Sequence, residues 1–197
     1  MDNQIQIDSL LSNTQGMVTT RQVTQAGLHR SVLTKLVQEG QLYQISRGIY
    51  LKPSAWEDEM FLLQLRYGKG VFSHETALFL HELTDRTPHV FSMTFPKGYN
   101  APSLKDENVM IRRVVPENYL LGLVEVSSPA GNSLRSYDVE RTLCDIVRGN
   151  NTCDIQIVNQ AMKRYAASRG KDINKLMSYA EQLRVKPKIL NYMEVLL

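Results

Sequence analysis

Residues 18–40 read VTTRQVTQAGLHRSVLTKLVQEG, and this stretch decides the fold of the N-terminal part of the chain. Thr19 followed three residues later by Gln22 is a capping-box pattern, which marks the start of a helix. That helix stops at Gly27, and the next helix begins two residues later and ends at Gly40. Two short helices joined by a tight turn that contains glycine are typical of a helix-turn-helix.

The second helix of this pair carries a polar face without negative charge. Its apolar stripe comprises Val32, Leu33, Leu36 and Val37. The opposite face shows side chains that can donate to phosphates and base edges, namely Arg30, Ser31, Thr34, Lys35 and Gln38. The first carboxylate is Glu39, at the far end. Because a helix that faces the DNA backbone must lack negative charge, the pattern predicts a recognition helix.

Elements on either side of this pair complete a winged helix-turn-helix. Apolar residues at i, i+3 and i+4 predict a preceding helix, with Ile7, Leu10 and Leu11 on one face. Residues 42–51 favour two strands, and the glycine after Arg47 suits a hairpin tip. Arg47 would then reach the DNA backbone or the minor groove. The predicted DNA-binding residues are Arg21, His29, Arg30, Ser31, Thr34, Lys35 and Arg47.

A domain boundary is expected shortly after the hairpin. Pro53-Ser54-Ala55 is a short break, so we expect a winged helix-turn-helix domain over residues 1–53 and a second domain over residues 54–197. Three short helices and a hairpin also build scaffold or protein-docking modules. DNA binding is therefore one of two interpretations of the first domain.

Charge is distributed unevenly along the 197 residues. The first 52 residues hold five Lys or Arg against three Asp or Glu, residues 53–150 hold ten against thirteen, and residues 151–197 hold eight against four. The basic tail is either a solvated face or a surface for an acidic partner, RNA or DNA. Candidates for such a surface are four basic residues without an evident structural role, Lys163, Arg164, Lys171 and Lys175.

The middle of the chain has the alternating pattern of short strands. Strands are expected over residues 90–95, 109–115, 121–126 and 134–137, separated by turns without helices between them. This pattern predicts a mostly antiparallel sheet. Helices are expected from Ser73, from Asp138 and throughout the tail. The predicted fold class is α+β, with a winged helix-turn-helix followed by a mostly antiparallel sheet and flanking helices.

No catalytic or metal-binding set emerges from the sequence. His74 begins an HE dipeptide, but the next histidine is His81, whereas a zinc-protease helix needs histidines four apart. Glu140 and Asp145 are five residues apart and lie on different faces of one helix. Asp138 at the N-cap and Glu140 in the first turn are already explained by capping and by the helix dipole. The chain also lacks a nucleophile elbow and a dinucleotide glycine fingerprint. We predict that the protein is not an enzyme and holds no cofactor or metal.

Cysteine usage and hydropathy point to a cytoplasmic protein. Cys144 and Cys153 are too few for a disulfide scaffold or a zinc finger, so both are expected to be structural, with free thiols. No run of about 18 apolar residues predicts a membrane helix. The N-terminus lacks the basic region of a signal peptide.

Three segments of the chain resemble the AbiEi family of antitoxins, from bacterial abortive-infection toxin–antitoxin systems. The first is the helix-turn-helix followed by EGQLYQISRGIY, residues 39–50, with the spacing G-x-L-x-x-x-x-R-G-x-Y. The others are SHETALFLH, residues 73–81, and VERTLCD, residues 139–145. Glu82 stands where the family often has a glycine after the LH dipeptide, a minor departure.

The resemblance implies a function for each domain. It implies that the first domain binds inverted repeats in the system's own promoter and represses it, and one recognition helix per half-site implies two molecules on the repeat. It implies that the second domain counters an AbiEii-like nucleotidyltransferase toxin, with or without a stable complex. The residues expected to take part in toxin neutralisation are Lys163, Arg164, Lys171 and Lys175. The alternative is a stand-alone winged-helix regulator whose second domain senses a ligand or dimerises. A toxin-like reading frame directly downstream would favour the antitoxin.

Overall fold

The computed structural model describes residues 2–149 and 153–196, which divide into two compact units between Asp58 and Glu59. The expected boundary lay five residues earlier, after residue 53. Two contacts keep the intervening segment with the first unit: Ala55 N donates to Lys52 O at 3.0 Å, and the Tyr43 hydroxyl donates to Glu57 Oε1 at 3.3 Å. The first unit is called the N-terminal unit below, and the second the C-terminal unit.

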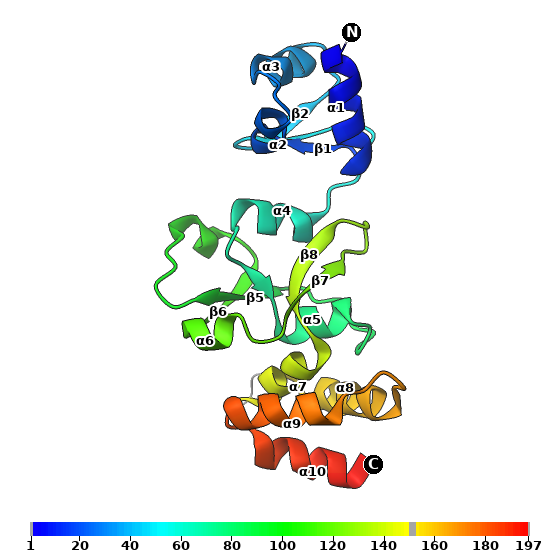
Figure 1. Ribbon diagram of the computed structural model, residues 1–197, viewed down its shortest axis with the longest axis vertical. Coiled ribbons are helices and arrows are strands. Elements are labelled where there is room, and N and C mark those ends of the chain that lie inside the picture. The colour runs from blue at the N-terminus through cyan, green and yellow to red at the C-terminus, as the bar shows by residue number, and fades with distance from the viewer. Residues whose placement is uncertain (1, 150–152, 197) are drawn as a thin grey trace. The chain divides into compact units, whose positions relative to one another are not determined.

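The N-terminal unit contains three helices and a three-stranded antiparallel sheet (Figure 1). Its elements are α1 (Asp2–Asn13), β1 (Met17–Thr19), α2 (Thr20–Gln25), α3 (Ser31–Gln38), β2 (Tyr43–Ser46) and β3 (Ile49–Leu51). The strand order is β1-β3-β2. The sequence did not predict β1, because three residues are too few to show alternation. Its strand conformation depends on pairing with β3, in which Met17 lies opposite Leu51.

One apolar cluster forms the core of the N-terminal unit. Its buried members are Ile7, Leu11, Val18, Val23, Leu28, Leu33, Leu36 and Leu42. The predicted stripe of α3 is confirmed at Leu33 and Leu36, but Val37 is 36% exposed. At 100° per residue, Leu33 and Leu36 lie in the middle of the stripe and Val37 at its edge. This explains why so short a helix buries only the central pair.

The C-terminal unit contains a five-stranded sheet and seven α-helices in the described residues. Its first half comprises α4 (Glu59–Arg66), β4 (Val71–Phe72), α5 (His74–Leu80), β5 (Phe91–Pro96), the 3₁₀ helix η1 (Pro102–Asp106), β6 (Val109–Val114) and α6 (Pro116–Tyr119). Its second half comprises β7 (Leu123–Ser127), β8 (Ser133–Tyr137), α7 (Val139–Val147), α8 (Ile155–Ala167), α9 (Ile173–Gln182) and α10 (Lys186–Leu196). None of the helices in the described ranges is both long and apolar enough to cross a membrane.

The sheet of the C-terminal unit is mixed, so the prediction of a mostly antiparallel sheet was wrong. In the order β6-β5-β4-β8-β7, the β5–β6 and β4–β8 pairs are parallel, and the β4–β5 and β7–β8 pairs are antiparallel. Residues 97–108 join β5 to β6, and a connection of about a dozen residues is long enough for a parallel return. The strands β4 and β8 are far apart in sequence, so no local turn sets their relative direction.

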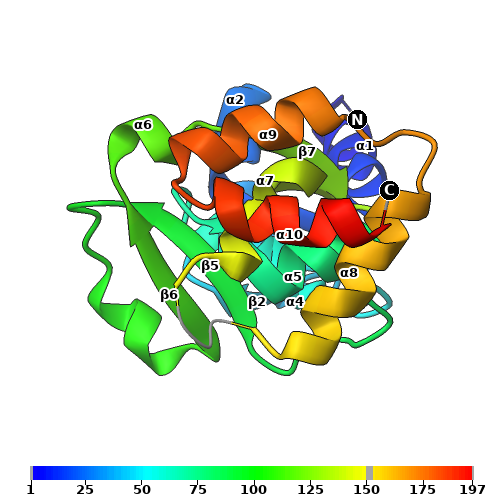
Figure 2. The same cartoon turned by 90° about the horizontal axis from the view of Figure 1, so that it is seen from below.

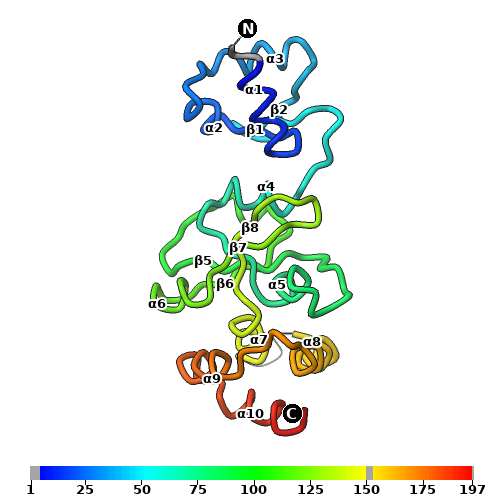
Figure 3. Tube along the Cα trace, turned by 45° about the vertical axis from the view of Figure 1, so that its right-hand side comes forward, coloured from blue at the N-terminus to red at the C-terminus, as the bar shows by residue number. Residues whose placement is uncertain are grey.

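Helices α4 and α5 cover opposite faces of this sheet (Figures 1 and 3). On the α4 side, Met93 and Phe95 of β5 pack with Met60 and Leu63. The alternate residues of β5 are polar and meet the α5 side: the Thr94 hydroxyl donates to Ser73 Oγ at 2.9 Å, and Ser92 N donates to Thr76 Oγ1 at 2.8 Å. Strand β5 therefore has one apolar face and one hydrogen-bonded polar face. Ser73 was predicted to cap α5, but it makes no side-chain cap.

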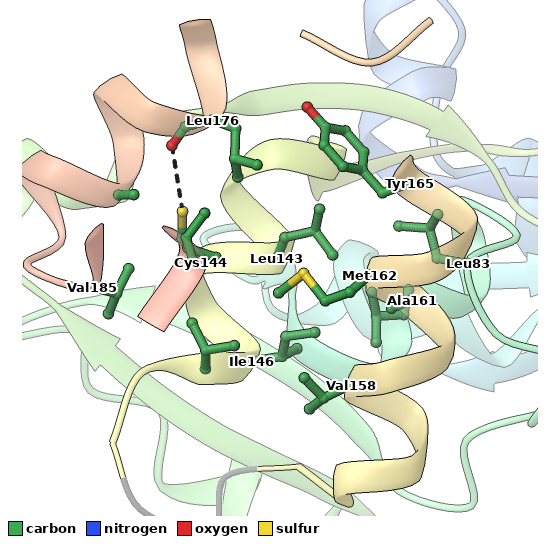
Figure 4. Close-up of a cluster of buried hydrophobic side chains, with 14 of the residues drawn as sticks. Leu83, Leu143, Cys144, Ile146, Val158, Ala161, Met162, Tyr165, Leu176 and Val185 are labelled. Carbon is green, nitrogen blue, oxygen red and sulfur yellow. Dashed lines mark hydrogen bonds between the residues drawn. The ribbon is translucent and has the colours of Figure 1, made fainter. Parts of the chain in front are cut away.

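The last four helices form a layer around α7 (Figure 2). Figure 4 shows Leu143, Cys144 and Ile146 of α7 among the side chains of α8, α9 and the segment before α10. Cys144 is fully buried, and its Sγ donates to Leu176 O at 3.9 Å. Burial raises the pKa of the Cys144 thiol to about 12. Both cysteines are free, as expected, and Cys144 is a core residue.

Candidate nucleic-acid interface

Local hydrogen bonds order the starts of both α2 and α3. The predicted capping box at α2 is present, with Gln22 N donating to Thr19 Oγ1 at 3.1 Å and Thr19 N donating to Gln22 Oε1 at 2.8 Å. The chain then turns, and Leu28 N donates to Val23 O at 3.0 Å. His29 Nδ1 lies 2.8 Å from Ser31 Oγ and accepts from Ser31 N at 3.3 Å. The two helices are therefore held by local bonds that the sequence encodes.

The tip of the β2–β3 hairpin is tied to the start of α2. Ser46 pairs with Ile49, so Arg47 and Gly48 form the turn, and Gly48 has a φ of 75°. This left-handed backbone suits glycine. The Gly48 carbonyl accepts from Thr20 N at 2.9 Å and from Thr20 Oγ1 at 3.4 Å. The exposed side chain of Arg47 is thereby placed beside α2.

These elements surround a hollow of about 930 Å³, here called the basic hollow. Its lining comprises Thr20, Arg21, Thr24, Gln25, His29, Arg30, Ser31, Leu33, Thr34, Gln44, Arg47, Gly48 and Tyr50. The lining includes three arginines and one histidine and contains no Asp or Glu. It brings together six of the seven residues predicted to bind DNA. The hollow is thus rich in positive charge and in hydrogen-bond donors.

The seventh predicted residue, Lys35, does not line the basic hollow. Its side chain is 74% exposed, and its Nζ lies 3.7 Å from Glu39 Oε1. An exposed pair one helical turn apart contributes little to stability. The Glu39 carboxylate nevertheless offsets part of the positive charge that Lys35 offers to an anion. Lys35 is therefore a weaker candidate than the arginines of the hollow.

Several lining residues were missed in the sequence. Thr24 and Gln25 lie three and four residues after Arg21, so helical spacing already placed them on the face of Arg21. Gln44 and Tyr50 are direct partners across the hairpin and share one face of the sheet. The sequence indicates that Gln44 and Tyr50 share this face only if the hairpin turn is first placed at Arg47 and Gly48, because the turn sets the strand register.

Two of the four basic residues suggested for a surface on the tail, Arg164 and Lys175, are held by neighbouring groups. Arg164 pairs with Asp85, and its Nη1 donates to Glu82 O at 2.8 Å. Lys175 Nζ lies 2.9 Å from Asp138 Oδ2 and 3.2 Å from Glu140 Oε2. Burial by itself lowers the pKa of Lys175, but the two carboxylates outweigh it and raise the pKa. The expectation that these two residues lack a structural role was therefore wrong.

The other two basic candidates are less engaged. Lys171 Nζ donates to Ser168 O at 3.2 Å. Lys163 is exposed and makes no hydrogen bond or ion pair with any residue that the structure describes. A charged partner would find these two ammonium groups more available than the guanidinium of Arg164 or the ammonium of Lys175.

The histidines and acidic residues considered as metal ligands have other partners. His81 Nε2 donates to Tyr137 O at 2.7 Å, and Asp138 Oδ1 accepts from Arg141 N at 2.8 Å, which confirms the predicted cap of α7. Asp145 is paired with the buried Arg141. Within residues 2–149 and 153–196, no three His, Cys, Asp or Glu side chains gather as metal ligands would.

Comparisons with known proteins give a family match for the N-terminal segment. The crystal structure of the RV2827C protein from Mycobacterium tuberculosis is similar at 15% identity with a TM-score of 0.48, covering 98% of this chain and 81% of that one. No protein of curated function matches the chain. A family model described as "Transcriptional regulator, AbiEi antitoxin" matches residues 6–51. The resemblance seen in the sequence is thus confirmed over residues 6–51, which match the AbiEi antitoxin family of transcriptional regulators.

Proposed function

We propose that the N-terminal unit is a winged helix-turn-helix that binds promoter DNA in the cytoplasm. The observation that carries this proposal is the basic hollow, whose lining contains no carboxylate and includes an arginine from each of three segments. Arg21 comes from α2, Arg30 from the turn before α3, and Arg47 from the hairpin tip. A phosphate backbone attracts such a surface without regard to base sequence.

The hollow contains two kinds of contact residue in this proposal. Arg21 and Arg47 lie on the elements that flank α3 and are assigned to phosphates. Ser31 and Thr34 lie on α3 itself, whose N-terminal residues would meet base edges in the major groove. Phosphate contacts position the protein and base contacts specify the sequence. The hairpin serves as the wing in this arrangement.

Each unit is proposed to have a separate task in an autoregulated antitoxin. One recognition helix covers only a half-site, so two molecules would occupy an inverted repeat in the promoter and repress it. The C-terminal unit would counter a nucleotidyltransferase-like toxin. The two other segments that resemble the AbiEi family, residues 73–81 and 139–145, supply α5 and α7, and these helices pack against each other.

Binding is tested by gel shift with the full chain and the region upstream of its own gene. We expect preference for the promoter over random DNA of the same length at about 100 mM salt, and affinity that falls as salt rises. A site with one half-repeat scrambled should bind one molecule instead of two. Equal affinity for promoter and random DNA would contradict the proposal.

The antitoxin role is tested by co-expression with the product of the neighbouring gene, scoring growth. We propose that Lys163 and Lys171 contribute to toxin neutralisation, because the carboxylates that hold Lys175 do not engage them. Replacing both by Ser should reduce rescue while circular dichroism shows an unchanged fold. Removing an exposed charge usually changes the free energy of unfolding very little, so a loss of rescue would not be due to unfolding. Full rescue by this variant would refute a basic surface at these residues.

A further inference from the structure

His29 presents two different nitrogens to two different surroundings. Its Nδ1 accepts from Ser31 N at 3.3 Å and lies 2.8 Å from Ser31 Oγ. A ring nitrogen that accepts an amide N–H carries no proton, so the neutral ring holds its proton on Nε2. The bond to Ser31 thus selects the tautomer. His29 Nε2 makes no hydrogen bond within the described part of the chain.

The start of α3 depends on this arrangement. Arg30 occupies the N-cap position with an αR backbone, φ −59° and ψ −24°, and contributes no side-chain cap. The first helical amide, that of Ser31, is instead satisfied by His29, and the next amide, Val32 N, donates to His29 O at 3.1 Å. Helix N-termini leave such donors without partners unless a neighbouring group supplies an acceptor.

His29 also lines the basic hollow, beside Arg30 and Ser31. We propose that His29 is a DNA-contact residue that caps α3 through Nδ1 while its Nε2–H donates to an acceptor atom on the DNA. This inference rests on the proposed DNA binding. The acceptor is a base-edge atom such as guanine N7, or a phosphate oxygen. One side chain then couples the order of the recognition helix to contact with its ligand.

Two substitutions separate the two nitrogens. In His29→Asn the side-chain oxygen takes the place of Nδ1 and accepts from Ser31 N, but nothing reaches the position of Nε2. In His29→Gln the longer amide reaches that position with a donor, and the short cap is weakened. Asparagine is a favoured capping residue, so His29→Asn should keep the stability of the N-terminal unit.

The experiment measures promoter affinity and thermal unfolding of the full chain. We expect His29→Asn to unfold like the wild type and to bind promoter DNA about three- to tenfold more weakly, the effect of losing one hydrogen bond. His29→Gln should bind more tightly than His29→Asn while melting at a lower temperature. The control is His89→Asn, at an exposed histidine of the C-terminal unit, which should leave affinity unchanged.

Each outcome decides the inference. Equal promoter affinity of His29→Asn and the wild type would overturn it, as would losses of affinity that follow losses of stability in both variants. Absence of promoter preference in the wild type would overturn the proposed function as well. The acceptor is identified with modified half-sites. If it is guanine N7, 7-deazaguanine removes the difference between wild type and His29→Asn. If the acceptor is a phosphate oxygen, a methylphosphonate linkage at that phosphate removes the difference in affinity between wild type and His29→Asn.

Discussion

Arg141 is the largest fully buried side chain among the residues that the structure describes. Its Nε donates to Asp145 Oδ2 at 3.0 Å, and its Nη1 donates to the carbonyls of Asn118 and Leu121 at 2.5 and 3.0 Å. The guanidinium also lies 4.2 Å from the centre of the Tyr137 ring. A buried guanidinium is stabilised when its charge and most of its donors are matched, and of the Arg141 guanidinium nitrogens only Nη2 has no hydrogen-bond partner among the described residues. Arg141 therefore ties α7 to the segment between β6 and β7.

We predict that Arg141→Met lowers the free energy of unfolding by about 3–5 kcal/mol, because it leaves the Asp145 carboxylate buried without a counter-charge. Urea denaturation followed by circular dichroism measures this loss. The variant Arg141→Met/Asp145→Leu removes both charges and should be more stable than Arg141→Met alone. If the double variant is less stable than the single one, the ion pair is not the source of the effect.

His74 predicts a pH dependence of stability. It is 8% exposed, and its backbone has a φ of 50°. Burial lowers its pKa from 6.5 to about 4; the Asp145 carboxylate opposes this shift, and the charges of nearby arginines add to it. The unfolded chain therefore takes up the proton first as the pH falls. The stability that neutral His74 contributes is present above about pH 6.5 and is lost progressively toward pH 4.

We expect His74→Asn to flatten this pH dependence. Asparagine tolerates the left-handed backbone but does not titrate in this range. Between pH 7 and pH 5 the wild type should lose about 2 kcal/mol more of its free energy of unfolding than the variant. Urea unfolding at the two pH values measures the difference. Parallel losses in both proteins would show that His74 does not bind its proton differently in the two states.

Arg47 and Lys35 form a matched pair for DNA binding, since both are exposed cations of the N-terminal unit. Arg47→Ala should weaken binding to promoter and random DNA alike and reduce the salt slope by about 1. Lys35→Ala should have a smaller effect, because Lys35 lies outside the basic hollow and faces Glu39. Fluorescence anisotropy over a series of salt concentrations measures both slopes. A larger loss for Lys35→Ala would place the DNA elsewhere on α3.

At the scale of elements, the start of α7 packs so closely against Gly122 that a side chain at this position would not fit. Gly122 has a φ of 73°, and a Cβ there would lie 2.7 Å from Arg141 Cβ and 3.0 Å from Asp138 Oδ1. Asp138 N donates to Gly122 O at 2.7 Å, so the glycine backbone contacts the cap of α7 directly. The close approach of the segment before β7 to α7 therefore requires a glycine.

Gly122→Ala should destabilise the protein more than Gly98→Ala does. Gly98 has a φ of 90°, but a Cβ there meets nothing within 4 Å. Both variants incur backbone strain of about 1–2 kcal/mol, and Gly122→Ala adds about 1–3 kcal/mol from overlap with α7. Thermal unfolding of the two variants measures the difference. Equal losses of stability in the two variants would mean that α7 moves away from the new methyl group without a free-energy cost.

At the scale of the whole molecule, each unit has its own core. The apolar cluster of the N-terminal unit contains no residue beyond Tyr50, and the clusters of the C-terminal unit begin at Met60. We predict that a fragment of residues 59–197 folds on its own and unfolds cooperatively, as circular dichroism during heating would show. A fragment starting at residue 71 lacks α4, exposes one face of the sheet and should not fold. Failure of the longer fragment would contradict independent folding.

The sequence determined features that depend on neighbouring residues. The capping box at Thr19, the cap at Asp138 and the hairpin turn at Arg47 are set by side chains within a few positions of one another. The candidate DNA-binding residues were also predictable, because helix periodicity and one turn place them together. Six of the seven line one hollow for this reason.

Only the tertiary structure decided the features that depend on distant partners. The direction of β8 against β4 joins Ser136 to Phe72, and no local pattern encodes a pairing across that distance. Lys175 was read as a free cation, yet it pairs with Asp138 and Glu140, which belong to another helix and its cap. Periodicity shows which side of a helix is polar. Whether a charge on that side meets water or a carboxylate depends on how the helices pack.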